Sequence, residues 1–472
     1  MSPVVKVPTG VPGLDRVTYG GLPKGRTTLI TGKSGAAKSI LALQLASNFA
    51  RSGLKTVVLA VEEAPEDLID SGDSLGFETS ALVARGMLRF ADLTRTPDTT
   101  TIVTGDYDVG AMVHRVEMVA KELGAQALVL DSATALFSPR PSEERLRSQF
   151  FHLVDAFRKH ALTAVVTAEA PDDYGPRTTL GVEDFVCDAV LVLRNLIDNE
   201  RRRRTIEVHK YRRSAHQKGE YPCTITNKGL IVFPFGTQPS RESAETSRFS
   251  SGFEGLDSMM SGGWLRDSII MARGPAGSGK TTLAGMYARA GALRGERVAY
   301  YGFEETRPML LRNFASIGLP MDELVQQGQL LLECRYPEAT SPEDLLVELR
   351  RSLEEFKPSL IVLDSISSVS HSTSPRGFRQ FMVGFASLVR DHCRSALLTQ
   401  VVSDMNEDKI VVPFLSTIAD AIIALDYQRH GKKLERTISV TKMRGAAHSD
   451  DAFRLLIQHG GLGVQELDGP DT

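Results

Sequence analysis

The sequence predicts an α/β protein with two tandem domains, each built on a mainly parallel central sheet with helices on both faces. Two observations lead to this prediction. Short apolar runs rich in β-branched residues alternate with helical stretches along the chain, which is the pattern of parallel strands covered on both sides. The second half also repeats the landmarks of the first half in the same order. A chain of 472 residues has room for both domains.

The repeat is regular enough to align the two halves. Gly10 corresponds to Gly252, and Lys38 to Lys280, at a constant offset of 242 residues. Further pairs recur at offsets of 232 to 242 residues: Glu62-Glu63 with Glu304-Glu305, Asp131 with Asp364, and Lys210 and Arg212 with Lys442 and Arg444. Solenoid repeats are much shorter, so this is duplication of a whole domain. We predict a first domain at 1–236, a polar, exposed linker at 237–247 and a second domain at 248–472.

Both domains are expected to share one order of elements. The predicted strands of the first domain are 27–31, 56–61, 127–130, 164–167 and 189–194, with a helix at 38–51; those of the second include 268–272, 298–303 and 359–364. Residues 190–194 and 205–210 predict an antiparallel pair joined by a turn at 199–204. We interpret Arg201 to Arg204 as a solvated tip, because blocks of like charge repel and stay hydrated.

The second domain contains a complete phosphate-binding loop. Residues 274–281 fit G-x-x-x-x-G-K-[ST], follow a predicted strand and open a helix, as this motif of P-loop NTPases requires. Backbone N–H groups of such a loop surround the phosphates, and the helix N-terminus adds its positive end. Lys280 should reach the β- and γ-phosphates of ATP, and Thr281 should offer a hydroxyl to Mg²⁺. The predicted ATP-binding residues here are Gly274, Ala276, Gly277, Ser278, Gly279, Lys280, Thr281 and Thr282.

Carboxylates follow two predicted strands of the same domain. Asp364 ends an apolar run and fits the Walker B acid, with a plain helix N-cap as the alternative. Glu304 and Glu305 stand where open α/β sheets bind ligands. One of them can orient or deprotonate the attacking group, and we assign Glu304 to Mg²⁺ as well. A solvated surface pair is the alternative, which the repetition at Glu62 and Glu63 disfavours.

The first domain departs from the motif at one position. Ala37 replaces the last glycine, and its methyl group would crowd the phosphate or strain a loop that needs positive φ. Since Lys38, Ser39 and Asp131 are present, we expect ATP to bind with slower or altered turnover, and Ser39 to serve Mg²⁺. A structural lobe with permanently lodged nucleotide is the alternative. The predicted ATP-binding residues of this loop are Gly32, Ser34, Gly35, Ala36, Ala37, Lys38 and Ser39.

Composition argues against several other classes of protein. The formal net charge of −3 disfavours a dedicated nucleic-acid binder. The four cysteines, Cys187, Cys223, Cys334 and Cys393, are not closely spaced, so zinc ligation and a disulfide framework are not expected. We expect reduced thiols in a cytoplasmic protein. No apolar run approaches the length of a membrane span.

Together these features resemble the KaiC family of RecA-like clock ATPases and autokinases, over almost the whole chain from about Thr9 to Phe453. The motifs that carry the resemblance are the double domain, the paired glutamates, Tyr174-Gly-Pro176, Gly219-Glu-Tyr-Pro222, Phe378-Arg-Gln-Phe381 and Lys442-Met-Arg-Gly445. The resemblance implies a homohexamer of two stacked rings with ATP between subunits. It also implies slow hydrolysis in the first ring and autophosphorylation of an adjacent Ser-Thr pair in the second.

The resemblance also implies individual roles. The acceptor pair matches Ser416 and Thr417, and Glu304 would be the general base. Lys442 and Arg444, like Lys210 and Arg212, would reach the γ-phosphate of the neighbouring subunit; salt bridges at a sheet edge are the alternative. An offset of 232 residues places Asp184 and Phe185 opposite the acceptors, so only the second domain has the hydroxyls. The alternative for Ser416 and Thr417 is an ordinary loop or helix cap.

The sequence says less about partner proteins than about the two domains. Val411 stands where better-known members have a threonine, and the chain ends soon after Phe453, without most of the tail that binds KaiA, so we expect activation without KaiA. The resemblance allows a KaiB-like partner, for which the sequence holds no separate signal. Two other functions stay open: a RecA- or helicase-like nucleic-acid motor, which would bind DNA in a salt-dependent way, and a nucleotide-sensing scaffold without kinase activity.

Overall fold

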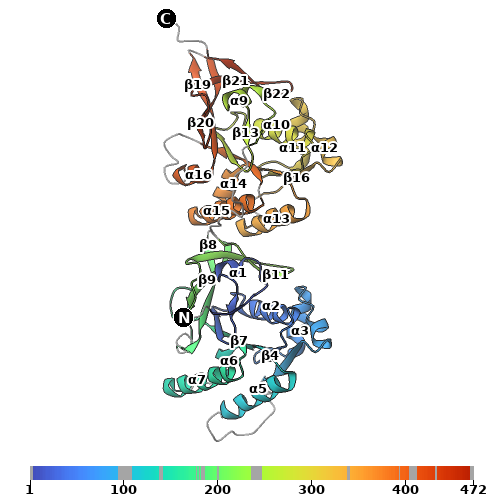
Figure 1. The fold of residues 1–472 in the computed structure, drawn as a ribbon. Helices are drawn as coiled ribbons and strands as arrows, with labels where there is room; N and C mark the ends of the chain where they lie inside the picture. Colours follow the sequence, from blue (N-terminus) through green and yellow to red (C-terminus); the bar gives the residue numbers. More distant parts are fainter. Residues whose placement is uncertain are drawn as a thin grey trace. The chain divides into compact units, whose positions relative to one another are not determined.

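The structure, a computed structural model, describes residues 4–93, 109–137, 142–176, 178, 179, 181, 186–198, 201–234, 247–336, 341–392, 394–402, 412–430 and 433–467. The chain divides into two compact units, Met1–Pro234 and Phe235–Thr472 (Figure 1). Almost all of the predicted linker, 237–247, lies outside the described residues.

The first unit is an α/β layer structure. Its main sheet has nine described strands in the order β11-β10-β9-β8-β3-β7-β6-β4-β5. The strands are β1 (Lys6–Val7), β2 (Leu22–Pro23), β3 (Thr27–Gly32), β4 (Thr56–Ala60), β5 (Leu88–Asp92), β6 (Ala127–Asp131), β7 (Thr163–Glu169), β8 (Ala189–Asp198), β9 (Arg201–Tyr211), β10 (Glu220–Thr226) and β11 (Gly229–Val232). The helices are α1 (Leu14–Val17), α2 (Lys38–Arg51), α3 (Pro65–Ser74), α4 (Thr79–Ala84), α5 (Val109–Leu123), α6 (Ala133–Leu136) and α7 (Glu143–Lys159).

The second unit repeats this plan. Its described strands form a main sheet in the order β16-β15-β17-β18-β14-β19-β20-β21-β22. The strands are β12 (Arg248–Phe249), β13 (Trp264–Leu265), β14 (Ile269–Gly274), β15 (Val298–Gly302), β16 (Leu330–Cys334), β17 (Leu360–Asp364), β18 (Ser395–Val401), β19 (Ala421–His430), β20 (Lys433–Met443), β21 (Phe453–Gln458) and β22 (Gly461–Glu466). The helices are α9 (Glu254–Met259), α10 (Lys280–Leu293), α11 (Arg307–Ser316), α12 (Asp322–Gln326), α13 (Pro342–Glu355), α14 (Ile366–His371), α15 (Pro375–Asp391) and α16 (Val412–Ile418).

The predicted fold class is confirmed in both units. The central strands pair in parallel, and the last ones along the chain, from β9 and from β20 onward, pair antiparallel. In the first unit α2 and α3 cover one face of the sheet, while α5 and α7 cover the other (Figure 1). Helix α7 shows why: Leu146, Phe150, Leu153 and Phe157 are buried at helical spacing, which gives an apolar stripe toward the sheet.

The predicted turn at 199–204 is wrong over its second part. Strand β9 begins at Arg201, which pairs with Asp198 of β8. Arg203 is only 8% exposed, and its guanidinium lies 3.7 Å from the carboxylate of Asp198. Because side chains alternate along a strand, Arg203 turns to the packed side while Arg202 stays exposed. The arginine run is therefore part of the sheet rather than a wholly solvated tip.

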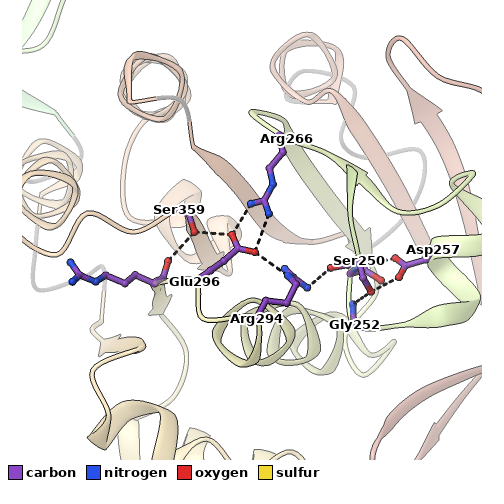
Figure 2. A network of polar contacts seen from close by, with 9 residues as sticks. Ser250, Gly252, Asp257, Arg266, Arg294, Glu296 and Ser359 are labelled. Atoms are coloured by element: carbon purple, nitrogen blue, oxygen red, sulfur yellow. Dashed lines mark hydrogen bonds and ion pairs between the residues drawn. The ribbon is translucent and has the colours of Figure 1, made fainter. Parts of the chain in front are cut away.

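A polar network ties the start of the second unit to the sheet (Figure 2). The Glu296 carboxylate accepts hydrogen bonds from Arg266 at 2.6 Å, from Arg294 at 2.9 Å and from the Ser359 hydroxyl at 2.9 Å. Arg294 follows α10 directly and also donates to the Ser250 carbonyl oxygen at 2.9 Å. Burial by itself raises the pKa of Glu296, but the donated hydrogen bonds outweigh burial and leave it lowered. The network thus fastens the segment after the linker to the end of α10.

Two general findings concern membranes and metals. Within the described part of the chain, no helix is long and apolar enough to cross a bilayer. The same residues contain no group of three or more His, Cys, Asp or Glu side chains arranged to hold a metal ion.

The described cysteines are free thiols: Cys187 and Cys223 are buried, and Cys334 is partly buried. Cys393 lies outside the described residues.

Candidate active site

The second phosphate loop joins the last residue of β14, Gly274, to the first residue of α10, Lys280. Gly277 and Gly279 have φ of 74° and 106°, which only glycine adopts without strain. A Cβ atom at Gly274 would lie 1.9 Å from the carbonyl oxygen of Leu425 in β19, so the first glycine is needed for packing against the neighbouring strand. The loop conformation therefore follows from its glycines.

Lys280 is the one charged side chain of this loop. It is 6% exposed, and its Nζ donates to the carbonyl oxygens of Gly274 and Pro275 at 2.8 and 2.7 Å. Burial lowers the pKa of Lys280, while the nearby carboxylates of Asp364 and Glu304 act in the opposite direction. The ammonium group is thus fixed over the loop at the N-terminus of α10, where the helix dipole also favours an anion.

Asp364 ends β17 next to this loop and is 8% exposed. Its carboxylate accepts hydrogen bonds from the hydroxyls of Thr399 in β18 and Tyr300 in β15, the latter at 2.6 Å. Burial raises the pKa of Asp364, and the hydroxyl donors, Thr281 included, oppose that rise. Because an ionised carboxylate without donors is costly to bury, these hydroxyl donors offset part of the cost of the charged form. Asp364 is not the N-cap of α14, which is Ser365.

The two glutamates after β15 have different surroundings. Glu304 accepts from the hydroxyls of Ser365 at 2.6 Å and Ser368 at 3.2 Å, which directs it toward the end of β17. Glu305 accepts instead from Asn313 of α11 at 2.7 Å. Both line a small cavity together with Thr281 and Asp364. The geometry favours Glu304 as the residue that acts beside the loop, with Glu305 fixed by α11.

The first unit reproduces much of this arrangement. Lys38 begins α2 and donates to the Lys33 carbonyl oxygen at 2.9 Å. Asp131, at the end of β6, accepts from the Thr167 hydroxyl. Glu62 accepts from Ser132 at 2.7 Å, as Glu304 does from Ser365. Burial, followed by the charge of Asp131, raises the pKa of Glu63.

The remaining predicted loop residues lie around the same two turns, between the strand and the start of the helix. They are Gly32, Ser34, Gly35, Ala36 and Ser39 in the first unit, and Ala276, Ser278 and Thr282 in the second. The Ser278 hydroxyl is fully buried and has no hydrogen-bond partner within the structure.

Ala37 occupies a strained position. It precedes α2 with φ of 77°, in the left-handed region that Gly279 occupies in the second unit. The sequence left two explanations open, crowding of the phosphate and strain of the backbone. The left-handed conformation of Ala37 shows that the strain is present in the loop itself. Ala37→Gly is expected to raise ATP turnover by the first unit, and to raise the free energy of unfolding by about 1 kcal/mol as the strain is relieved.

Steady-state ATP hydrolysis and thermal unfolding would measure both effects. Gly279→Ala is the matched change in the second unit, because a Cβ there meets its nearest atom only at 3.5 Å and adds strain without a clash. Turnover that stays the same in Ala37→Gly would reject the prediction that strain at this position limits hydrolysis by the first unit.

The predicted basic residues lie at the opposite edge of the sheet from the loop of their own chain. By this edge we mean the side where the parallel strands begin, whereas the loop follows the last residue of its strand. The N–H of Arg444 bonds to Asp420, whose own N–H bonds to Ile269, the first residue of β14; the loop follows the last, Gly274. These two ends of β14 are about 17 Å apart at 3.3 Å per residue. Arg212 stands in the same way next to the first residue of β3, through Asp188 and Thr27.

Ser416 and Thr417 lie in α16, at this same edge. Lys442 donates to the carbonyl oxygens of Ser416 and Ala419, and Arg444 donates to that of Thr417 at 2.8 Å. Thr417 is exposed, and its hydroxyl donates to the Phe414 carbonyl at 2.7 Å. The interpretation of these residues as a helix cap is wrong, since both lie within the helix. Asp184, Phe185 and Val411 lie outside the described residues.

Sequence reasoning missed three residues that touch the Walker B carboxylates: Thr167, Thr399 and Tyr300. The two threonines had a usable signal, because each lies on the strand beside the Walker B strand and the two correspond at an offset of 232 residues. Tyr300 had no counterpart in the first half and therefore no repeat to identify it.

The comparisons with known proteins agree with this architecture. The family described as "ATPase: KaiC" matches residues 7–236 and 249–469. The chain is 38% identical over 469 residues to the circadian clock oscillator protein KaiC of Picosynechococcus sp., covering 98% of this chain and 90% of that protein. It is 36% identical to the protein of the same name from Parathermosynechococcus lividus, with 98% and 86% covered. It is also 36% identical to circadian clock protein KaiC3 of Synechocystis sp., with 98% and 92% covered.

Proposed function

The chain belongs to the KaiC family of ATPases, and from this premise we propose that it is a serine/threonine autokinase whose second unit phosphorylates Ser416 and Thr417 of a neighbouring subunit. Hydrolysis of ATP is the family activity. The proposal adds the acceptor residues, the direction of transfer between subunits, and the assembly that this transfer requires.

One observation supports transfer between subunits most strongly. The acceptor hydroxyls and the cations Lys442 and Arg444 share one edge of the second unit, because Lys442 of β20 and Arg444, the residue after β20, both contact α16. The loop and Glu304 of the same chain lie at the other ends of the strands. A hydroxyl must approach within about 3–3.5 Å of the phosphorus for in-line attack. Only a second copy of the chain can bring these two edges together without unfolding the sheet.

The roles follow from the contacts. Lys280 and the loop amides hold the β- and γ-phosphates. Glu304, exposed and directed by Ser365 and Ser368, accepts the proton of the attacking Ser416 or Thr417 hydroxyl. A bond forms between that oxygen and the γ-phosphorus, the bond to the β–γ bridging oxygen breaks, and ADP leaves. Lys442 and Arg444 of the acceptor subunit offset the charge that builds on the transferred group.

The oxygen donors beside the loop fit Mg²⁺. The hydroxyl of Thr281 and the carboxylates of Asp364 and Glu304 are hard oxygen ligands, and Mg²⁺ is usually held by one or two carboxylates together with substrate phosphates. Ser39 and Asp131 offer the same donor types in the first unit. When bound there, Mg²⁺ would neutralise charge between the β- and γ-phosphate oxygens.

The first unit is proposed to be a slower ATPase. Glu62, next to Ser132, takes the position of Glu304, and the left-handed Ala37 strains the loop that holds the nucleotide. Lys210 and Arg212 would complete the site of the neighbouring first unit, because Arg212 lies beside the first residue of β3 and the loop of the same chain follows the last. We propose a homohexamer of two rings as the assembly. A KaiB-like protein is the proposed partner, since the relatives are named as clock proteins.

Incubation of the purified chain with ATP and Mg²⁺, followed by intact-mass measurement, tests the proposal. The wild type is expected to gain phosphoryl groups, and Ser416→Ala/Thr417→Ala is expected to gain none. Ser370→Ala is a matched control, because this half-buried hydroxyl donates only to the Ser367 carbonyl of α14. A gain that survives the double substitution would place the acceptor elsewhere. No gain in the wild type, with ADP still formed, would leave an ATPase without kinase activity.

A further inference from the structure

Tyr300 makes a contact to the Walker B carboxylate that the first unit does not have. Its hydroxyl donates to Oδ2 of Asp364 at 2.6 Å, while Thr399 donates to Oδ1. The ring of Tyr300 is fully buried in β15 and packs edge-to-face on Phe314 of α11, with ring centroids 5.9 Å apart. Both oxygens of the carboxylate are therefore fixed, one of them by a side chain that packing prevents from turning.

The first unit holds its Walker B acid with fewer fixed donors. Asp131 accepts from Thr167, the counterpart of Thr399. The residue at the position of Tyr300 is Val58, at the offset of 242 residues, and valine has no hydroxyl. Asp131 is also partly exposed, whereas Asp364 is buried. The two sites share the loop lysine, the acids and the threonine beside the Walker B strand, and they differ at this donor as well as at Ala37 and Gly279.

The carboxylate also lies beside the phosphate loop. Thr281, the second residue of α10, lines the same small cavity as Asp364. The carboxylate that Tyr300 and Thr399 fix is therefore next to the hydroxyl proposed to hold the cation. Hydrogen bonds to groups around a metal orient them, and loss of such a bond typically weakens metal binding by about 10- to 100-fold.

We propose that Tyr300 is a positioning residue of the second active site, which orients Asp364 for the divalent cation that accompanies the nucleotide. The inference rests on the proposed function, because it takes Thr281, Asp364 and Glu304 as the cation site. Tyr300 is not a catalytic residue, since Asp364 separates it from the reacting groups. The second unit thus binds its cation with a preorganised carboxylate, which the first unit lacks.

Manganese, which can be followed by electron paramagnetic resonance, is the probe. Titration of the full chain with Mn²⁺ in the presence of ADP is expected to give two classes of site, one for each unit. Lys280→Ala identifies the class of the second unit by its loss. In Tyr300→Phe that class is expected to weaken by about 10-fold or more, with the other class unchanged. Thr399→Val removes the second donor and is expected to weaken the same class.

Tyr287→Phe is the matched control. Tyr287 is a fully buried tyrosine of α10 whose hydroxyl has no hydrogen-bond partner in the structure. It packs on Trp264 at a centroid distance of 6.0 Å, so the loss of its hydroxyl tests burial without the contact to Asp364. Mn²⁺ binding in Tyr287→Phe is expected to match the wild type, and thermal unfolding should show that all variants are folded.

Two results would overturn the inference alone: equal Mn²⁺ affinities in Tyr300→Phe and the wild type, or the same weakening in Tyr287→Phe. If the wild type binds Mn²⁺ with ADP only in the class that Lys280→Ala leaves intact, the cation site of the second unit is absent. That result would overturn the proposed function together with the inference.

Discussion

Lys280→Ala is expected to abolish autophosphorylation while ATP hydrolysis by the first unit continues. The ammonium group of Lys280 is buried, fixed by the Gly274 and Pro275 carbonyls, and attracted by Asp364 and Glu304. No other side chain of the loop carries a charge. Removal of one fixed donor to a developing charge costs about 100- to 1,000-fold in rate, and loss of nucleotide affinity adds to this.

Incorporation of labelled γ-phosphate per chain and the nucleotide content of the purified protein measure the two effects. Lys433→Ala is the matched control, because Lys433 is an exposed lysine at the start of β20 in the same unit. Lys38→Ala is the corresponding change in the first unit and should remove the hydrolysis that Lys280→Ala spares. If Lys280→Ala incorporated label at the wild-type level, the second loop would not be the kinase site.

The phosphate loops could be predicted from the sequence because their chemistry depends on residues that are close together in the chain. Glycines at fixed spacing, a lysine and a hydroxyl residue at a helix start form a site within eight residues, and the structure places them at the end of β14 as expected. The acidic residues at strand ends could be predicted for a similar reason. Asp364 and Glu304 each come at the end of an apolar run, and parallel strands bring such ends to one edge of the sheet.

Other features depend on contacts between segments far apart in the chain. The hydroxyl of Tyr300 reaches Asp364 across adjacent strands, and nothing in the sequence around Tyr300 indicates that contact. Arg203 resembled a solvated charge until its pairing with β8 placed it on the packed side. The difference between Glu304 and Glu305 likewise rests on serines after β17 and an asparagine in α11. Register and packing, rather than composition, decide these cases.

The register of the strands in the second unit also gives the most specific prediction about phosphoryl transfer between subunits. Lys442→Ala/Arg444→Ala is expected to lose autophosphorylation by about 1,000-fold or more, the range attributed to a cation supplied in trans. Loss alone is ambiguous, because both side chains also hold carbonyls of α16 and their removal would disturb the acceptor helix. Mixed assemblies remove this ambiguity.

We expect activity to return when Lys442→Ala/Arg444→Ala chains are co-assembled with Lys280→Ala chains. The first type has an intact loop and Glu304, and the second type has an intact acceptor edge. Because cations and acceptors lie on one edge of one subunit, the phosphate should be found on the Lys280→Ala chain, whose own second loop lacks the lysine that holds the nucleotide. Chains that carry different mass tags allow intact-mass measurement to assign it.

A Lys280→Ala chain that also carries Ser416→Ala/Thr417→Ala is the control, and it should restore no phosphorylation to the mixture. Phosphate on the Lys442→Ala/Arg444→Ala chain would contradict transfer to the subunit that supplies the cations. That chain's own acceptors lie beside the first residue of β14, and its own loop follows the last, about 17 Å away, so transfer within it would require α16 to leave the position that it has in the wild-type structure. The location of the phosphate, more than its amount, therefore decides between transfer across the interface and transfer within one chain.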